Sequence, residues 1–141
     1  MGTLNFQNPK KTYIVNDGAE IHFNPADVNF VSRLFDLMGR LEARQKEEIP
    51  ADPEDVFKIA AQRDAELRAE IDAVFEEPVC DKVFGSTNLF SPAGGVPVCL
   101  NFLMAVIDEI DAAAEAETKT SPAVAAYVKK YESKYGKYSR K

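Results

Sequence analysis

The same helix-start signal occurs twice in this sequence, at Asn24-Pro25-Ala26-Asp27 and again at Asp52-Pro53-Glu54-Asp55. In each, a short polar side chain can cap the helix, and proline follows at the first helical position, where its missing N–H costs nothing. An acid then lies at the positive end of the helix dipole. The two signals therefore predict helices that begin near residues 25 and 53.

Apolar side chains recur every three or four residues after each start, which is the spacing of one helix face. In the first helix, expected to run to about Glu47, they are Phe30, Leu34, Leu37, Met38 and Leu41. In the second they are Val56, Ile59, Ala60, Leu67, Ile71, Val74 and Phe75. Because only about five residues join the two helices, we expect an antiparallel helical hairpin over residues 25–76.

A β-hairpin is predicted before the first helix, over residues 12–23. Two β-type runs flank Asn16-Asp17-Gly18-Ala19, and the Asp-Gly pair accepts the positive φ angles of a type I′ turn. With Asp17 and Gly18 as the loop, Ile14 would face Ile21 and Thr12 would face Phe23 on the buried side. A lone hairpin is marginally stable, so we expect it to pack on helices.

The most apolar segment begins at Pro97 and is expected to form the central helix of the fold. Its apolar positions are Val98, Cys99, Phe102, Leu103, Val106, Ile107 and Ile110. A short helix ending at Gly85 and a turn at Gly94-Gly95 are expected before it. The predicted fold class is α+β, mostly α: an N-terminal β-hairpin packed on an antiparallel helical bundle, with Phe102 and Ile107 buried.

Charge divides the chain into an acidic domain, residues 1–126, and a basic tail, residues 127–141. The tail holds six basic residues and one acid, a net charge of +5, whereas the domain holds eleven basic residues and twenty-two acids, a net charge of −11. Ser121-Pro122 is expected to cap a last helix, and the tail is predicted to continue it or to lack regular structure. Tyrosines recur in the tail at helical spacing beside lysines.

This tail is the predicted binding surface for a protein partner, either a different protein or the acidic domain of a second copy. The candidate partner-binding residues are Tyr127, Lys130, Tyr131, Lys134, Tyr135 and Tyr138. An equally weighted alternative is that Tyr127, Val128 and Tyr131 dock a terminal helix on the core while the lysines are solvated.

No pattern indicates a catalytic residue, a metal site or a cofactor. His22 is the only histidine and is expected to be exposed on the hairpin, opposite Tyr13. Cys80 and Cys99 form no C-x-x-C pair, and we interpret them as core thiols. The acid clusters lie mainly at helix ends, where acids are ordinary capping and surface residues. We therefore predict that the protein is not an enzyme.

Charge and hydropathy also restrict the partners and the location. A net charge of −6 argues against binding nucleic acid, which requires cations to neutralise phosphates. The longest apolar runs fall far short of the roughly 20 residues that cross a bilayer. The first residues have neither the charged start nor the apolar stretch of a secretion signal. We expect a cytoplasmic protein without a membrane partner.

Several stretches resemble small proteins encoded in the tail-morphogenesis region of phages and prophages of Gram-positive gut bacteria. They are Ile71-Asp72-Ala73-Val74-Phe75, Cys80-Asp81-Lys82-Val83-Phe84-Gly85, the segment from Pro97 to Ile110, and the hairpin followed by Phe23-Asn24-Pro25. The resemblance covers residues 12–110 and leaves the basic tail outside.

This resemblance implies a non-enzymatic tail assembly chaperone or tail-associated structural protein. Its partner would be another morphogenesis protein, typically the long helical tape-measure protein, and it supplies no site motif from which residues could be carried over. The alternative is a small-molecule-binding or regulatory module that uses the Gly94-Gly95 loop. An enzyme acting through carboxylates and Mg²⁺ ranks below both.

Overall fold

The computed structural model describes residues 1–16, 18–44, 52–116 and 122–139. These residues form two antiparallel strand pairs and a set of helices, which confirms the α+β, mostly α, prediction. The elements are β1 (Lys11–Val15), β2 (Ala19–Phe23), α1 (Val28–Arg44), α2 (Pro53–Phe75), α3 (Val79–Phe84), β3 (Pro92–Ala93), β4 (Val96–Pro97), α4 (Val98–Ala116) and α5 (Pro122–Ser139).

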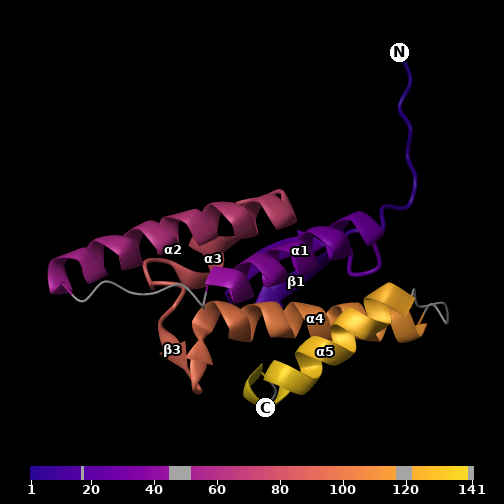
Figure 1. The fold of residues 1–141 in the computed structure, drawn as a ribbon. Coiled ribbons are helices and arrows are strands. Elements are labelled where there is room, and N and C mark those ends of the chain that lie inside the picture. The colour runs from indigo at the N-terminus through magenta and orange to yellow at the C-terminus, as the bar shows by residue number, and fades with distance from the viewer. Residues whose placement is uncertain (17, 45–51, 117–121, 140–141) are drawn as a thin grey trace.

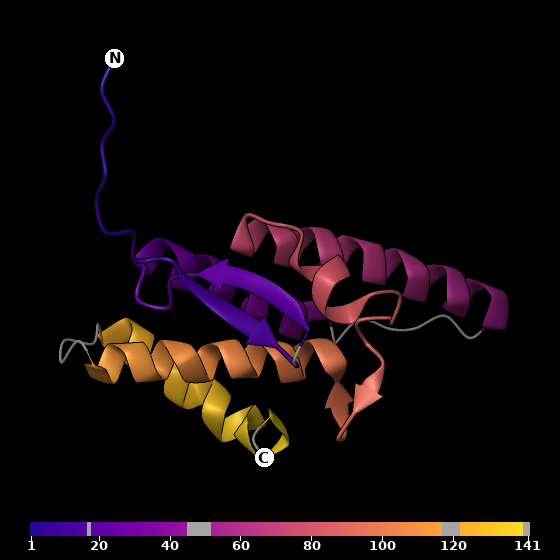
Figure 2. The same ribbon diagram turned by 180° about the vertical axis from the view of Figure 1, so that it is seen from behind.

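The β1–β2 hairpin lies on the helices, with α4 along one side and α2 and α3 along the other (Figure 2). Helices α1 and α2 pack on each other, and α5 packs along α4 (Figure 1). One hydrophobic core joins β2 to all five helices. Phe23 stands at its hairpin end, with its ring centroid 5.1 Å from that of Phe30 and 5.5 Å from that of Phe75. Phe102 and Ile107 are buried in this core, as predicted.

The hairpin register differs from the predicted one by one residue. Ile14 does not face Ile21, and Thr12 does not face Phe23. The observed pairs are Lys11–Phe23, Thr12–His22, Tyr13–Ile21, Ile14–Glu20 and Val15–Ala19. Because side chains alternate across a strand, this shift turns Tyr13 and Val15 toward the core and leaves Ile14 60% exposed.

The cause of the shift is that Val15, and not Asn16, pairs with Ala19. Asn16 adopts a left-handed φ of 50°, and the Gly18 N–H donates to the Val15 carbonyl oxygen at 3.0 Å. Asparagine tolerates this backbone conformation better than most residues, so the loop can begin one residue earlier than the Asp-Gly pair suggests.

Helix α1 begins three residues later than predicted. Asn24 accepts the Ala26 N–H at 3.0 Å and so closes a turn that precedes the helix. Asp27 then accepts the Asn29 N–H through its side chain at 3.2 Å and the Val31 N–H through its carbonyl oxygen at 2.9 Å. Asp27 is therefore the helix cap, and Pro25 lies outside the helix. The predicted end near Glu47 lies outside the described residues.

Helix α2 begins as predicted, since Asp52 has an extended backbone and its side chain accepts the Glu54 N–H at 3.0 Å. Pro97 does not begin the central helix. It pairs with Pro92 in the β3–β4 ribbon, and α4 starts at Val98. Gly94 and Gly95, with φ angles of 68° and 94°, form the turn of that ribbon.

Candidate functional site

The outer half of α2, residues 53–66, extends beyond the rest of the fold. Figures 1 and 2 both show it projecting past the ends of the neighbouring helices. In α2, where every residue is described, burial begins only at Leu67. With 23 residues, α2 is about 35 Å long, whereas the 17 described residues of α1 span about 26 Å. The helix is therefore longer than the described part of α1, on which it packs.

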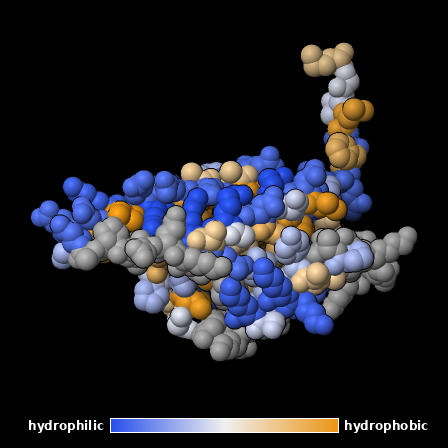
Figure 3. All heavy atoms as spheres, viewed as in Figure 1, coloured by the Kyte–Doolittle hydropathy of each residue, from blue (hydrophilic) through white to orange (hydrophobic). Residues whose placement is uncertain are grey.

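An apolar face therefore remains accessible on the outer half of α2. The sequence predicted Val56, Ile59 and Ala60 as part of a buried stripe, but the structure leaves them only half-buried. Phe57 lies around the helix from Val56, on the side away from Ile59, and is 76% exposed. Figure 3 shows hydrophobic side chains among hydrophilic ones over this end of the helix. An uncovered apolar helix face is typical of a surface that binds another protein.

A depression of about 210 Å³ lies on this face. Its lining residues are Val56, Ile59, Ala60, Arg63, Asn88 and Phe90. Four of the six are apolar, and of the two polar residues Arg63 lies on α2 and Asn88 on the loop after α3. The depression can accept one or two apolar side chains of a partner, held by Phe90 and Ile59.

The loop that carries Phe90 is fixed on α2 by polar side chains. Asp64 accepts the Leu89 N–H at 2.7 Å, and Arg68 donates to the Thr87 carbonyl oxygen at 2.7 Å. Arg68 also contacts Asp64 at 3.0 Å. Leu89 is fully buried, so it anchors the loop in the core. Phe90 is thereby held next to the α2 depression.

The tail forms helix α5 and packs on the body. Val128 is buried and Tyr131 is only 1% exposed, whereas Tyr127 is 45% exposed. The rings of Tyr127 and Tyr131 stack on Phe35 of α1 at centroid distances of 5.0 and 5.8 Å. These positions correspond to the docking alternative for the tail, and they place Tyr131 away from the surface. The side chains of Tyr135 and Tyr138 lie outside the described part of the chain.

Two of the predicted tail lysines contact this chain's own Glu42 on α1. Lys134 donates to its carboxylate at 3.1 Å, and Lys130 lies 3.6 Å from it. Burial alone would raise the pKa of Glu42. The hydrogen bonds from Tyr131 and Lys134, with the charges of both lysines, outweigh burial and hold that pKa below its usual value of 4.5. Glu42 therefore joins α5 to α1.

Replacing Glu42 by glutamine is expected to lower the free energy of unfolding by about 1 kcal/mol at neutral pH, because both lysines are half exposed and water screens them. A carboxyl group with a depressed pKa stabilises the fold above its ordinary pKa and loses that effect as the pH falls. The difference in the free energy of unfolding between the two proteins, measured by urea titration, should therefore shrink as the pH falls below 4.5 and vanish once the pH is below the depressed pKa. A difference that stays constant from pH 7 to pH 3 would contradict the assignment.

His22 is half-buried and paired with carboxylates, in contrast to the exposed position expected for it. It lies opposite Thr12, not Tyr13. Its Nδ1 is 3.1 Å from Glu77, its Nε2 is 3.3 Å from Glu20, and its backbone N–H donates to Glu77 at 3.3 Å. Glu77 is 55 residues away in sequence, so no local pattern signalled this pair. The contacts attach β2 to the segment before α3.

Cys80 and Cys99 are buried free thiols, as interpreted from the sequence. Burial raises the pKa of Cys80 strongly, and it raises that of Cys99 to about 12. Among the described residues, no group of three or more histidine, cysteine, aspartate or glutamate side chains could hold a metal ion. No helix within the same residues combines the length and the apolar character needed to cross a membrane.

Comparison with protein-family models, with curated protein sequences and with solved structures finds no match for this chain. The site is therefore assigned from its geometry. Neither the depression on α2 nor the groove beside β1 described below is lined by Gly94 or Gly95, and we derive no ligand site from that turn.

Proposed function

We propose that this protein is a non-enzymatic binding protein that holds an apolar helical segment of another protein on the outer half of α2. The observation that carries the proposal is the apolar face of that half-helix. It continues the stripe that is buried from Leu67 onward, but here Val56 and Ile59 are only half-buried and the depression beside Phe90 is open. An amphipathic helix laid against this face would bury both apolar surfaces.

The kind of partner is suggested by the resemblance of residues 12–110 to phage tail-morphogenesis proteins. On that basis we propose a tail assembly chaperone or tail-associated structural protein that acts in the cytoplasm, that of the host cell if a phage encodes it. Its partner would be a long helical protein such as the tape-measure protein, which exposes apolar helix faces until the tail polymerises. The order of neighbouring genes tests this: tail genes beside the coding sequence would support it, and a metabolic operon would contradict it.

The binding surface is tested by replacing Ile59 with serine, and separately Val56 with serine, since both line the depression. Each change removes an apolar side chain that a partner would bury, worth about 1.5–3 kcal/mol, so the affinity should fall at least about tenfold. Affinity for the tape-measure protein, or for peptides covering its apolar helices, is measured by titration calorimetry.

The matched control replaces Ala65 with serine, on the opposite side of the same half-helix. This variant should bind as the unchanged protein does. Since none of the three residues is buried, all variants should keep the unfolding midpoint within a few degrees. Equal affinity of the Ile59→Ser, Val56→Ser and Ala65→Ser proteins would show that the partner binds elsewhere.

A further inference from the structure

The two edges of the β1–β2 hairpin differ. On the β2 edge, the His22 N–H donates to Glu77 at 3.3 Å, and the Glu20 carbonyl oxygen accepts from Lys82 at 3.3 Å. Side chains from the α3 region thus bind one outward backbone group of each of these two β2 residues. These contacts also show which residues of the hairpin direct their backbone groups outward.

The outward residues of β1 follow from the register. Thr12 pairs with His22, and Ile14 pairs with Glu20. In an antiparallel ladder, two opposite residues direct their backbone N–H and C=O groups either both toward each other or both outward. Because His22 and Glu20 direct theirs outward, so do Thr12 and Ile14. Within the described part of the chain, no hydrogen bond from another element reaches the backbone of Thr12 or Ile14. Strand β1 is therefore an open edge of the kind that accepts a further strand.

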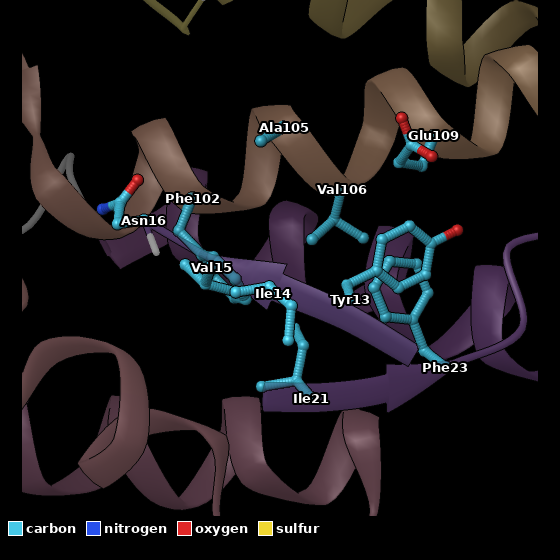
Figure 4. Close-up of a pocket in the computed structure, with 10 residues that line it drawn as sticks. All are labelled: Tyr13, Ile14, Val15, Asn16, Ile21, Phe23, Phe102, Ala105, Val106 and Glu109. Atoms are coloured by element: carbon cyan, nitrogen blue, oxygen red, sulfur yellow. The ribbon is translucent and has the colours of Figure 1, made fainter. Parts of the chain in front are cut away.

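A groove of about 310 Å³ runs between this edge and α4 (Figure 4). Val15 and Phe102 lie toward one end, and Val106 and Tyr13 toward the other, where the Tyr13 hydroxyl bonds to Glu109. Burial, and then the negative charge of Glu109, raise the pKa of Tyr13. The groove is thus mostly apolar, with an acid at one end.

Residues 1–10 form an arm that leaves the body on the side away from α4 and α5 (Figures 1 and 2). Its apolar side chains are uncovered: Leu4 is 91% and Phe6 83% exposed. They alternate with Thr3, Asn5 and Gln7, the pattern of a strand with one apolar face. The arm therefore has the pattern of a strand but no sheet in the described part of its own chain.

We infer that residues 3–8 of one copy pair with the open edge of β1 in a second copy and place Leu4 and Phe6 in the groove against α4. Six residues of extended chain span about 20 Å and the five of β1 about 17 Å, so the lengths match. The charges also match, because the arm contains Lys10 and no acid, while Glu109 lies at the groove. Since the arm points away from its own groove, the occupant is the arm of another copy.

This association uses the arm, β1 and α4, and it is independent of the proposed partner site on α2. Either can fail without the other. Reciprocal exchange of two arms would close a two-fold symmetric dimer.

Cross-linking tests the pairing directly. One protein carries Phe6→Cys and a second, distinguished by a size tag, carries Ala105→Cys in the groove. The native thiols do not compete, because Cys80 and Cys99 are buried and their pKa values are raised. Mixed and oxidised, the two proteins should form a disulfide-linked pair. The Asn5→Cys protein, with its thiol on the opposite face of the arm, should do so several-fold more slowly.

Sedimentation velocity tests the association without cross-links. The unchanged protein should show a concentration-dependent dimer. Leu4→Asp with Phe6→Asp should weaken it at least about tenfold, the change that 1.4 kcal/mol produces. Thr3→Asp with Asn5→Asp adds the same charge on the other face and should weaken it much less. Thr12→Pro, which removes an outward N–H from β1, should also weaken it.

Three results would overturn the inference. The first is a monomer at all concentrations up to the millimolar range. The second is equal cross-linking by the Phe6→Cys and Asn5→Cys proteins. The third is a Phe6→Cys, Ala105→Cys double variant in which, on dilution, the disulfide forms only between the two cysteines of one chain. Because the arm side chains are exposed, loss of folding cannot explain the effect of their replacement. Circular dichroism verifies the fold of the Thr12→Pro protein.

Discussion

Replacing Phe102 by alanine is expected to lower the free energy of unfolding by about 3–5 kcal/mol, the range for a large aromatic side chain removed from a core. Phe102 joins α4 to two other elements, since its ring centroid lies 5.8 Å from that of Phe75 on α2 and 5.6 Å from that of Phe84 on α3. The change removes apolar contact and leaves a cavity between three helices. Urea titration at neutral pH measures it.

The control makes the same substitution at Phe57, which is exposed on the outer half of α2. Phe57→Ala should change the free energy of unfolding by no more than about 0.5 kcal/mol, because little apolar area leaves a buried environment. If Phe102→Ala costs less than about 1 kcal/mol, α4 is not the centre of this core.

Replacing Tyr131 by alanine should cost a similar amount, about 3–5 kcal/mol, although it lies in the tail. Its ring is buried between α5 and Phe35 of α1, and its hydroxyl bonds to Glu42. Loss of this side chain should detach α5, which hydrogen exchange would show as fast exchange of α5 amides. Slow α5 exchange in the variant would contradict the docking.

Tyr127→Ala is the matched comparison, because Tyr127 stacks on the same Phe35 ring but remains 45% exposed. It should cost about 1 kcal/mol, in keeping with an aromatic pair at the surface. These positions also determine how the tail can be tested as a binding surface for a partner. Ending the chain at Ala126 would remove Val128 and Tyr131 from the core and so would destabilise the fold. Single changes at Tyr127 and at exposed Lys129 instead test partner binding without that loss of stability.

Local signals in the sequence determined the order and type of the elements. Three such signals each predict a helix from a few turns of sequence: the Asp52-Pro53 cap, the apolar spacing of Leu34 to Leu41, and the apolar run from Val98 to Ile110. The two apolar patterns also predict which face of the helix is buried. These features depend on backbone sterics and helical spacing, which neighbouring residues alone define. The fold class and the burial of Phe102 followed from them.

Tertiary structure determined the strand register, the burial of each helix face and the long-range ion pairs, none of which follows from the spacing of neighbouring residues. The hairpin register depended on Asn16 entering a left-handed conformation, which moved every pair by one residue. The burial of the α2 apolar stripe depended on its neighbours: the same spacing is fully buried at Leu67 and only half-buried at Ile59. The partners of His22 and of Lys134, at Glu77 and Glu42, lie 55 and 92 residues away. Burial and ion pairing belong to the assembled fold, because both require surfaces that only folding brings together.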